Sequence, residues 1–359
     1  MSENAHDSPR FEPGDHGAAG FDVAATLATV FEGRTLSRED ARRAMGRLMD
    51  GELSQMQAAA LLAALRTRGE TVEEIVGFAE AMRARSVKVP VESDTPLLDI
   101  CGTGGTGTTT INVSTTAMFV AAAGGARLAK HGNRGVTKRS GSADVLEALG
   151  VHLDVTPERL ARAIEEVGLA FMFARNHHPA MRFVAPIRAD LKARTIFNNL
   201  GPLTNPAGAS RQLMGVYSPA LTRTLAEVLR GLGLERALVV HGDGLDDFTI
   251  SGETFVSELR PDGEIVEHTL APEDVGLDRA PRASLLGGEP AENAAAARAI
   301  LAGERRGPQR DVVQFNAGAA LYLADVAGSV AEGVARAGAL LDAGAGLEVL
   351  ERYRTFSRA

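Results

Sequence analysis

The sequence predicts an α/β protein in which a small all-helical domain accompanies a larger α/β domain, whose central, mostly parallel sheet is flanked by helices. Between residues 21 and 85, apolar side chains recur at helical spacing. From about Pro90 onward, short apolar segments of strand length alternate with helical patterns, which is typical of a parallel or mixed sheet. The chain has 359 residues, 45% of them hydrophobic, so it is long enough to bury a substantial core in such a fold.

Capping patterns mark successive helix starts in the N-terminal part. Ser37 precedes an apolar helical pattern. Ser54 and Thr71 are each followed three residues later by Gln or Glu, the capping box that satisfies free N–H groups at a helix start. Gly69 stands where the left-handed end of a helix favours glycine. We therefore expect three to four helices with short connections.

Domain boundaries follow from these changes of pattern. We expect a disordered lead-in over residues 1–21, which are rich in Pro, Gly and charged side chains. The helical domain should span residues 22–90, and residues from roughly 186 to 206 should return to it as a helical piece followed by a loop rich in Pro and Asn. Residues 91–185 and 207–359 should form the α/β domain.

Five segments of the α/β part have the composition of buried strands: 97–100, 127–130, 171–174, 212–217 and 237–241. A hairpin or edge pair is expected over 258–270, and helices are expected over 157–167, 218–232, 293–302 and 329–343. In open α/β sheets, ligands bind beyond the carboxyl ends of the strands. The loops after residues 100, 130 and 241 therefore form the candidate site.

Two polar loops, each after one of these strands, outline a phosphate site. Residues 102–107 read Gly-Thr-Gly-Gly-Thr-Gly; backbone N–H groups of such a loop approach an anion closely, and the following helix points its dipole at the same place. The second loop carries a cluster of cationic and polar side chains within ten residues: Lys130, His131, Asn133, Arg134, Lys138 and Arg139. We expect fixed positive charge beside the glycine loop if the two strands are neighbours.

A pair of carboxylates follows the last of these strands. Asp246 and Asp247 lie on a glycine-flanked loop after His241. Mg²⁺ favours one or two carboxylates together with phosphate oxygens and retained water, so the pair predicts a magnesium site. The alternative, a solvated acidic turn, stays open on this feature alone.

Composition excludes several classes of function. The net charge of -8 argues against nucleic acid as a partner, because affinity for a phosphate backbone comes from a basic face. Cys101 is the only cysteine, which excludes a disulfide framework and fits a reducing compartment, with a buried structural thiol as the simplest role. The apolar runs are shorter than the ~20 residues of a membrane span, and residues 1–21 lack a signal-peptide pattern. We expect a cytoplasmic protein that binds a small anionic ligand.

From about residue 25 to the C-terminus, the chain resembles the anthranilate phosphoribosyltransferase family of tryptophan biosynthesis. The resemblance rests on six segments in this order: Gly-Thr-Gly-Gly at 102–105, Asn-Val-Ser-Thr at 112–115, Lys-His-Gly-Asn-Arg at 130–134, Ser-Gly-Ser-Ala-Asp at 140–144, Phe-Asn-Asn-Leu-Gly-Pro-Leu-Thr-Asn-Pro at 197–206 and Gly-Leu-Asp-Asp at 244–247. It implies a fold of the nucleoside phosphorylase type that dimerises through the helical domain. The implied reaction transfers the phosphoribosyl group of 5-phosphoribosyl 1-diphosphate (PRPP) to the amino group of anthranilate, giving N-(5-phosphoribosyl)anthranilate and diphosphate, with Mg²⁺.

The resemblance also implies site residues, motif by motif. The implied contacts to PRPP are Gly102, Gly105, Thr106, Thr110, Asn112, Val113, Ser114, Thr115, Lys130 and Ser142. The implied contacts to anthranilate are Gly102, His131, Asn133 and Arg188, and the implied metal ligands are Ser114, Asp246 and Asp247. The expected catalytic residues are Lys130, Arg188, Asp246 and Asp247. Arg188 fits its role because a guanidinium matches a carboxylate bidentately.

The chemistry of the implied reaction agrees with this set. When diphosphate leaves, positive charge develops on the sugar and negative charge on the leaving group. The protein must therefore mainly neutralise the leaving group and position the two substrates. An aromatic amine is already neutral at pH 7 and needs no strong base. We therefore expect His131 to line the substrate or to be a structural hydrogen-bonded histidine, and His177 and His178 to be structural.

Three positions depart from the family pattern. Thr106 stands where the family usually has Asp, and Asp247 stands where it usually has Glu. A serine pair of the family is replaced by Thr137 and Lys138. Our hypothesis is that Lys138 partly replaces neutralisation by metal.

Three alternatives remain at this stage. A pyrimidine nucleoside phosphorylase shares the implied fold, but the pair Asp246 and Asp247 speaks against it because phosphorolysis needs no Mg²⁺-diphosphate clamp. A non-enzymatic nucleic-acid-binding paralogue would need a basic surface, which the net charge of -8 disfavours. A related transferase that uses a substituted aromatic amine stays open.

Overall fold

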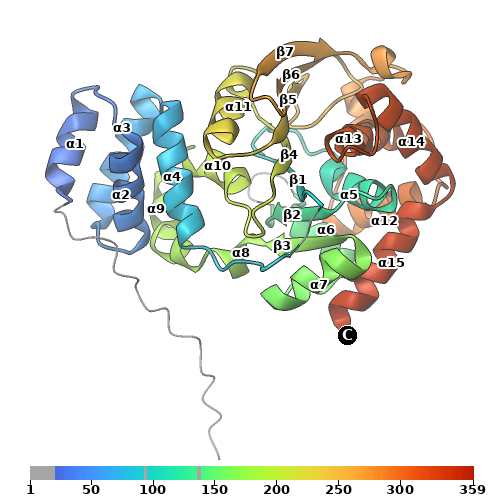
Figure 1. Cartoon of the computed structure of the whole chain (residues 1–359), viewed down its shortest axis with the longest axis horizontal. Helices are drawn as coiled ribbons and strands as arrows, with labels where there is room; N and C mark the ends of the chain where they lie inside the picture. The colour runs from blue at the N-terminus through green and yellow to red at the C-terminus, as the bar shows by residue number, and fades with distance from the viewer. Residues whose placement is uncertain (1–20, 93–94, 136–138) are drawn as a thin grey trace, which may run out of the picture.

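The structure is a computed structural model that describes residues 21–92, 95–135 and 139–359. It has a helical bundle at one end, a central sheet, and a layer of C-terminal helices at the other end (Figure 1). Within the described ranges, no helix is both long and apolar enough to cross a membrane. Residues 1–20 of the expected lead-in, and Lys138 with the hypothesis attached to it, lie outside the described residues.

The N-terminal helices begin where the capping patterns predict. They are α1 (Val23–Phe31), α2 (Arg38–Met49), α3 (Gln55–Arg68) and α4 (Val72–Ala84). Ser37 caps α2, and both predicted capping boxes are present at Ser54 and Thr71. Gly69 ends α3 with a positive φ of 89°, but its ψ of 135° is not that of the expected left-handed helical conformation.

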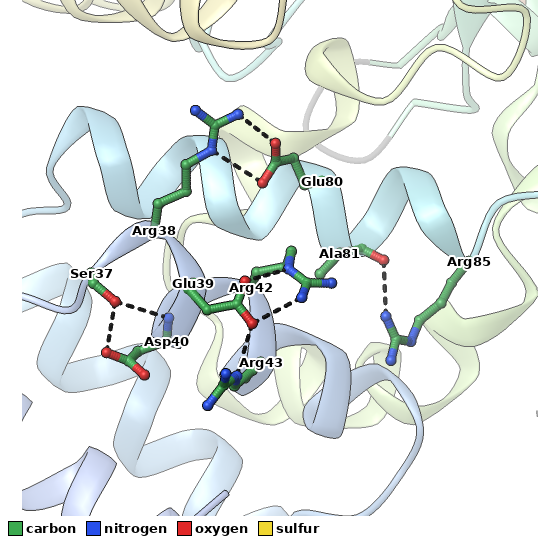
Figure 2. Close-up of polar contacts among 9 residues, drawn as sticks. All are labelled: Ser37, Arg38, Glu39, Asp40, Arg42, Arg43, Glu80, Ala81 and Arg85. Atoms are coloured by element: carbon green, nitrogen blue, oxygen red, sulfur yellow. Dashed lines mark hydrogen bonds and ion pairs between the residues drawn. The ribbon is translucent and has the colours of Figure 1, made fainter. Parts of the chain in front are cut away.

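Charged side chains join the bundle to the rest of the chain. Glu39 accepts hydrogen bonds from Arg42 and Arg43 along α2, whereas Arg38 pairs with Glu80 of α4 (Figure 2). Arg38 Nη2 also donates to the carbonyl oxygen of Gly231 at 3.2 Å. This arginine therefore connects two bundle helices with the end of α11 (Leu221–Gly231) in the α/β part.

A seven-stranded sheet in the order β3-β2-β1-β4-β5-β6-β7 forms the centre of the molecule. Its strands are β1 (Leu98–Gly102), β2 (Leu128–Gly132), β3 (Leu169–Phe173), β4 (Arg211–Gly215), β5 (Arg236–Gly242), β6 (Thr254–Leu259) and β7 (Ile265–Leu270). The first five pair in parallel, and β6 and β7 add an antiparallel hairpin. All five predicted strands are confirmed. The predicted hairpin is also present, although it begins at Thr254 instead of residue 258.

Helices cover both faces of the sheet. They are α5 (Val113–Ala123), α6 (Ser142–Ala148), α7 (Pro157–Val167), α8 (Ala174–His177), α9 (Ala185–Leu191), α10 (Phe197–Leu200), α11, α12 (Pro290–Leu301), α13 (Pro308–Leu323), α14 (Val330–Asp342) and α15 (Ala345–Arg358). The sequence patterns do not anticipate α13 and α15. In α13 the residues from 312 to 321 are all buried, so no polar face interrupts the apolar pattern at helical spacing.

Two apolar clusters lie on opposite faces of the sheet, because successive residues of a strand point to opposite sides. Leu213 of β4 belongs to a cluster with residues of α5, α13 and α15. Its neighbour Met214 belongs to a second cluster with α11 and the helical bundle. Ile187 of α9 and Phe197 of α10 join this second cluster, and α9 contacts α3. The exact domain boundaries remain a prediction.

Candidate active site

The glycine loop after β1 contacts a carboxylate of the loop after β5, which lies two strands away in the sheet. The backbone N–H of Gly104 donates to Asp246 Oδ2 at 2.8 Å. A Cβ atom placed on Gly102 would lie 2.4 Å from the same oxygen, and one on Gly215 would lie 1.7 Å from the carbonyl oxygen of Asp246. Only glycine at these two strand ends allows the acidic loop to approach. The loops after β1 and β5 therefore form one surface, as the sequence predicts.

The acidic loop is held by its own backbone and by a buried histidine. Gly242 and Leu245 exchange two backbone hydrogen bonds, at 3.0 and 2.9 Å. His241 Nδ1 lies 2.7 Å from the carbonyl oxygen of Val216, and the backbone N–H of Gly244 donates to its Nε2 at 3.3 Å. A carbonyl accepts and an N–H donates, so His241 is the neutral tautomer with its hydrogen on Nδ1. The sequence analysis assigned His241 no role.

Lys130 lies buried beside the glycine loop. Its ammonium group donates to the carbonyl oxygen of Ile100 and, at 3.3 Å, to Ser114 Oγ. Ser114 belongs to the first turn of α5, whose free N–H groups and dipole favour an anion. Lys130 and Ser114, predicted from separate motifs, therefore meet at one place.

Asp99 is a buried carboxyl group near Lys130. It accepts hydrogen bonds from the backbone N–H of His131 at 3.1 Å and from Asn205 Nδ2 at 2.8 Å. Burial raises the pKa of Asp99 to about 6, although the charge of Lys130 opposes this rise. Asp99 is not among the site residues predicted from the sequence. Cys101, two residues along the strand, is also buried; burial raises the pKa of its thiol well above the ordinary value, which agrees with a structural role.

Two histidines lie together at the carboxyl end of β2. The rings of His131 and His178 have centroids 5.1 Å apart. His131 Nδ1 lies 3.1 Å from the carbonyl oxygen of Gly201, whereas its buried Nε2 has no hydrogen-bond partner in the described part of the chain. Both ring nitrogens of His178 are buried as well, and the backbone of Thr204 is a polar neighbour of this ring. Burial lowers the pKa of both rings, that of His178 to about 4. The unpaired Nε2 of His131 is therefore an acceptor that a polar ligand can use.

Arg188 reaches the same segment from α9. Its guanidinium lies 5.7 Å from the ring centroid of Phe197 in α10, which runs directly into Gly201. Burial lowers the pKa of this guanidinium. The partner of His131 and the ring under Arg188 thus belong to one short stretch, so two of the predicted anthranilate contacts lie against the segment 197–201.

Two arginines of the second loop lie against carboxylates. Arg134 pairs with Asp144 and Glu147, and Arg139 Nη1 lies 3.6 Å from Glu289 Oε1. Both arginines are therefore paired with carboxylates, whereas Lys130 supplies positive charge beside the glycine loop, as expected for neighbouring strands. The arginines are paired because α6 and the residue preceding α12 place carboxylates against the loop. Asn133 is exposed, and its side-chain oxygen accepts a hydrogen bond from the backbone N–H of Arg134.

The remaining predicted PRPP contacts fall into different environments. Thr110 is buried and bridges to Leu286 through its backbone, and the side chain of Val113 packs in the core. Thr106 Oγ1 and Thr115 Oγ1 are buried without a hydrogen-bond partner among the described residues. Ser142 begins α6. Gly105 has a positive φ of 78°, which explains the glycine at this position of the loop.

Arg194 is a further residue that the sequence analysis missed. Its guanidinium donates to the carbonyl oxygen of Gly105 and lies 4.1 Å from the ring centroid of Tyr217. The backbone N–H of Tyr217 in turn donates to Thr103 Oγ1 at 3.1 Å. Arg194 therefore links the segment that carries Arg188 with the glycine loop. Arg194 lies between α9 and α10, and no local sequence pattern there predicts a contact with the glycine loop.

The donor set for a metal is small. Within the described ranges, no group of three or more His, Cys, Asp and Glu side chains could hold a metal ion. Asp246 is buried, Asp247 is half-buried, and Ser114 supplies a hydroxyl on the other side of the glycine loop. Two carboxylates and a hydroxyl suit Mg²⁺ when phosphate oxygens and water complete its coordination, so these residues fit the ion that the family implies.

Comparison with known proteins agrees with this architecture. The α/β domain of a glycosyl transferase family matches residues 94–347, and its helical bundle domain matches residues 25–86. The anthranilate phosphoribosyltransferase of Deinococcus radiodurans is 52% identical over 331 residues, which are 92% of this chain and 98% of the relative.

Solved structures extend the similarity to three dimensions. The enzyme of that name from Thermus thermophilus matches with a TM-score of 0.89 at 51% identity, over 93% of this chain and 99% of that one. The enzyme from Saccharomyces cerevisiae, solved in complex with PRPP and Mg, matches with a TM-score of 0.85 at 25% identity, over 94% and 98%. The chain is therefore a pentosyl-transferring enzyme and belongs to the anthranilate phosphoribosyltransferase family.

Proposed function

We propose that this enzyme transfers the phosphoribosyl group of PRPP to the amino group of anthranilate, a step of tryptophan biosynthesis, and releases diphosphate. The observation that carries the proposal is the contact between Asp246 and the N–H of Gly104 at 2.8 Å. It places a carboxylate loop against a glycine loop at the carboxyl edge of the sheet, beside buried Lys130. The family membership supports the same reaction.

The donor site works by neutralising the leaving group. As the bond between ribose C1 and the diphosphate oxygen breaks, negative charge grows on diphosphate and positive charge on the sugar. Lys130, the N–H groups of the glycine loop and the first turn of α5 are positioned to stabilise that negative charge. Because Lys130 is buried and already donates to the carbonyl oxygen of Ile100, this stabilisation needs little reorganisation.

Asp246, Asp247 and Ser114 are the proposed ligands of Mg²⁺. When bound, the ion would neutralise and orient the diphosphate. Gly104 holds Asp246 in place by its N–H, and the paired backbone of Gly242 and Leu245 shapes the turn that leads from β5 to the two carboxylates. These residues contribute a preformed anionic surface on which a cation and a polyphosphate fit together.

The acceptor site combines one cation with two neutral rings. We propose that Arg188 pairs with the anthranilate carboxylate, since a guanidinium matches a carboxylate bidentately. His131 and His178 would then line the aromatic ring, and the unpaired Nε2 of His131 would accept a hydrogen bond from the amino group. Because anthranilate attacks as a neutral amine, this geometry needs no strong base. Gly102 and Asn133 remain proposed contacts.

We further propose a cytoplasmic homodimer that associates through the helical domain. Phe31 of α1 and Met56 of α3 are 62% and 82% exposed, although both are large apolar side chains. Exposed apolar residues on neighbouring helices are typical of an interface. The helical domain so defined comprises residues 22–90 with the segment 186–206.

Loss of anthranilate fluorescence on mixing with PRPP tests the proposal directly. We expect turnover with both substrates and Mg²⁺ and a strong decrease when Mg²⁺ is chelated. A control with phosphate and thymidine or uridine should release no base. Substituted anthranilates measure acceptor tolerance. No turnover of anthranilate at saturating PRPP would contradict the proposal, and phosphorolysis or salt-dependent DNA binding in its place would favour one of the alternatives.

A further inference from the structure

A chain of amide hydrogen bonds joins α12 to the two phosphate loops. The backbone N–H of Gly288 donates to Asn293 Oδ1 at 2.8 Å, and Asn293 Nδ2 donates to Asn112 Oδ1 at 2.9 Å. Ser140 Oγ donates to the same Asn112 oxygen at 3.1 Å, and Asn112 Nδ2 donates to the carbonyl oxygen of Ser140 at 3.2 Å. Asn112 directly precedes α5, and Ser140 precedes α6.

The backbone groups at the two ends determine how both side-chain amides are oriented. An N–H such as that of Gly288 only donates, so the atom of Asn293 that faces it must be the oxygen. The nitrogen of Asn293 then faces Asn112. At the other end, the carbonyl of Ser140 only accepts, so it must face the nitrogen of Asn112. Both amides are therefore assigned by their surroundings, although oxygen and nitrogen are similar in shape.

This orientation decides which part of Asn112 remains available. Its Oδ1 accepts from two donors, which is the full capacity of a carbonyl oxygen. Its Nδ2 uses one hydrogen for Ser140, and the second has no partner among the described residues. Asn112 is half-buried, and this second hydrogen is the group that we assign to a ligand. A hydrogen-bond donor suits an anion, whereas the carbonyl oxygen would repel it.

Asn293 itself is fixed from all sides. It is 2% exposed, and a Cβ atom on Gly287 would lie 2.5 Å from its Oδ1. The backbone N–H of Gly287 donates to Thr109 at 3.0 Å, and that of Ile111 donates to Leu285 at 3.1 Å. These two hydrogen bonds fix the loop before α12 against the segment that leads into Asn112. They thereby set the distance between Asn293 and Asn112.

We propose that Asn293 is a positioning residue for the donor substrate, which acts by holding the Asn112 amide with its N–H toward PRPP. The proposal rests on the proposed function, in which Asn112 contacts PRPP. Asn293 does not touch the substrate. Its role is to occupy the oxygen of Asn112, so that an anionic phosphate or ribose hydroxyl meets a donor.

The test is the isosteric variant Asn293→Asp. A carboxylate still accepts from Gly288, but it has no hydrogen for Asn112 and places an oxygen against Asn112 Oδ1. We expect KM for PRPP to rise about tenfold, with KM for anthranilate changed less than about twofold. Asn293→Ala, which adds no charge, should raise KM for PRPP in the same direction and covers the case in which the aspartate variant does not fold.

The same measurements in an Asn112→Ala background separate this role from general support of the fold. Because Asn293 acts through Asn112, Asn293→Asp or Asn293→Ala should have almost no further effect on KM for PRPP there. Equal effects in both backgrounds, or unchanged KM for PRPP in folded single variants, would overturn the proposal. If Asn112→Ala itself leaves KM for PRPP unchanged, the assumed contact is wrong, whereas failure of the proposed function would appear as no turnover by the unaltered enzyme.

Discussion

Asp246 Oδ2 and the backbone N–H of Gly104 are joined by a 2.8 Å hydrogen bond across 142 residues of sequence. A Cβ at Gly102 would fall 2.4 Å from the same carboxylate oxygen. The glycine loop and the acidic loop are thus in direct contact. This contact makes the geometry of one loop depend on the charge and position of the other.

The variant Asp246→Asn should distinguish the effect of the negative charge of Asp246 from the effect of its shape. The amide keeps the volume and can still accept from Gly104, but it removes one negative charge from the proposed metal site. We expect kcat to fall about 10²–10³-fold and the Mg²⁺ concentration for half-maximal rate to rise. Asp243→Asn, an exposed change in the same loop, is the control and should have little effect. Equal kinetics for both variants would argue against a metal role for Asp246.

His178→Ala should affect the acceptor selectively. Both ring nitrogens of His178 are buried, and its ring centroid lies 5.1 Å from that of His131. We expect KM for anthranilate to rise about tenfold, since a polar contact and ring packing are lost together, with KM for PRPP unchanged. Steady-state kinetics with each substrate varied in turn provide the measurement. A rise in KM for PRPP alone would contradict this assignment.

The buried histidines should make the fold less stable in mild acid. The pKa of His178 falls to about 4 in the folded chain from an ordinary value of 6.5, so below pH 6.5 the unfolded chain binds the extra proton. Stability is therefore lost as pH falls from 6.5 toward 4, by about 3 kcal/mol for His178 alone. Asp99, whose pKa is raised to about 6, acts in the opposite direction because the folded chain binds its proton first.

Urea unfolding at pH 7.5 and pH 5 measures the sum of these effects. We expect lower stability at pH 5, since burial also lowers the pKa of His131 and His177. In His178→Phe the difference between the two pH values should shrink. A difference that stays the same in this variant would show that His178 is not buried in its neutral form.

Arg194→Met should loosen the glycine loop. It removes the hydrogen bond to the carbonyl of Gly105 and the cationic contact with Tyr217 while keeping an apolar side chain of similar length. We expect KM for PRPP to rise about five- to tenfold. Arg182→Met, which loses a comparable contact with the exposed ring of Phe183, is the matched control. An equally large effect at Arg182 would indicate a general loss of structure.

Met56→Glu should weaken the proposed dimer. A charge at this exposed apolar position of α3 would have to be desolvated in an interface. We expect sedimentation to show monomers for this variant and dimers for the unaltered enzyme. Phe255→Glu, at a 47% exposed ring on β6, should remain dimeric. A Met56→Glu variant that stays dimeric would place the interface elsewhere.

Local patterns predicted much of the fold. The capping boxes at Ser54 and Thr71 and the five strands are confirmed, because each pattern depends on residues a few positions apart. The patterns failed for α13, which is buried on nearly every side and so has no periodic polar face. They also did not predict that Arg134 pairs with Glu147, since this contact depends on where α6 packs.

The sequence by itself determined which residue types stand at the strand ends: glycines, Lys130, and the pair Asp246 and Asp247. Only the tertiary structure decided which of them meet. It brought Asp246 to Gly104, Arg194 to Gly105 and Asn293 to Asn112, contacts between segments that are far apart in the chain. The physical reason is that helix and strand periodicity reflects neighbouring residues, whereas these contacts follow from how the sheet and its covering helices pack.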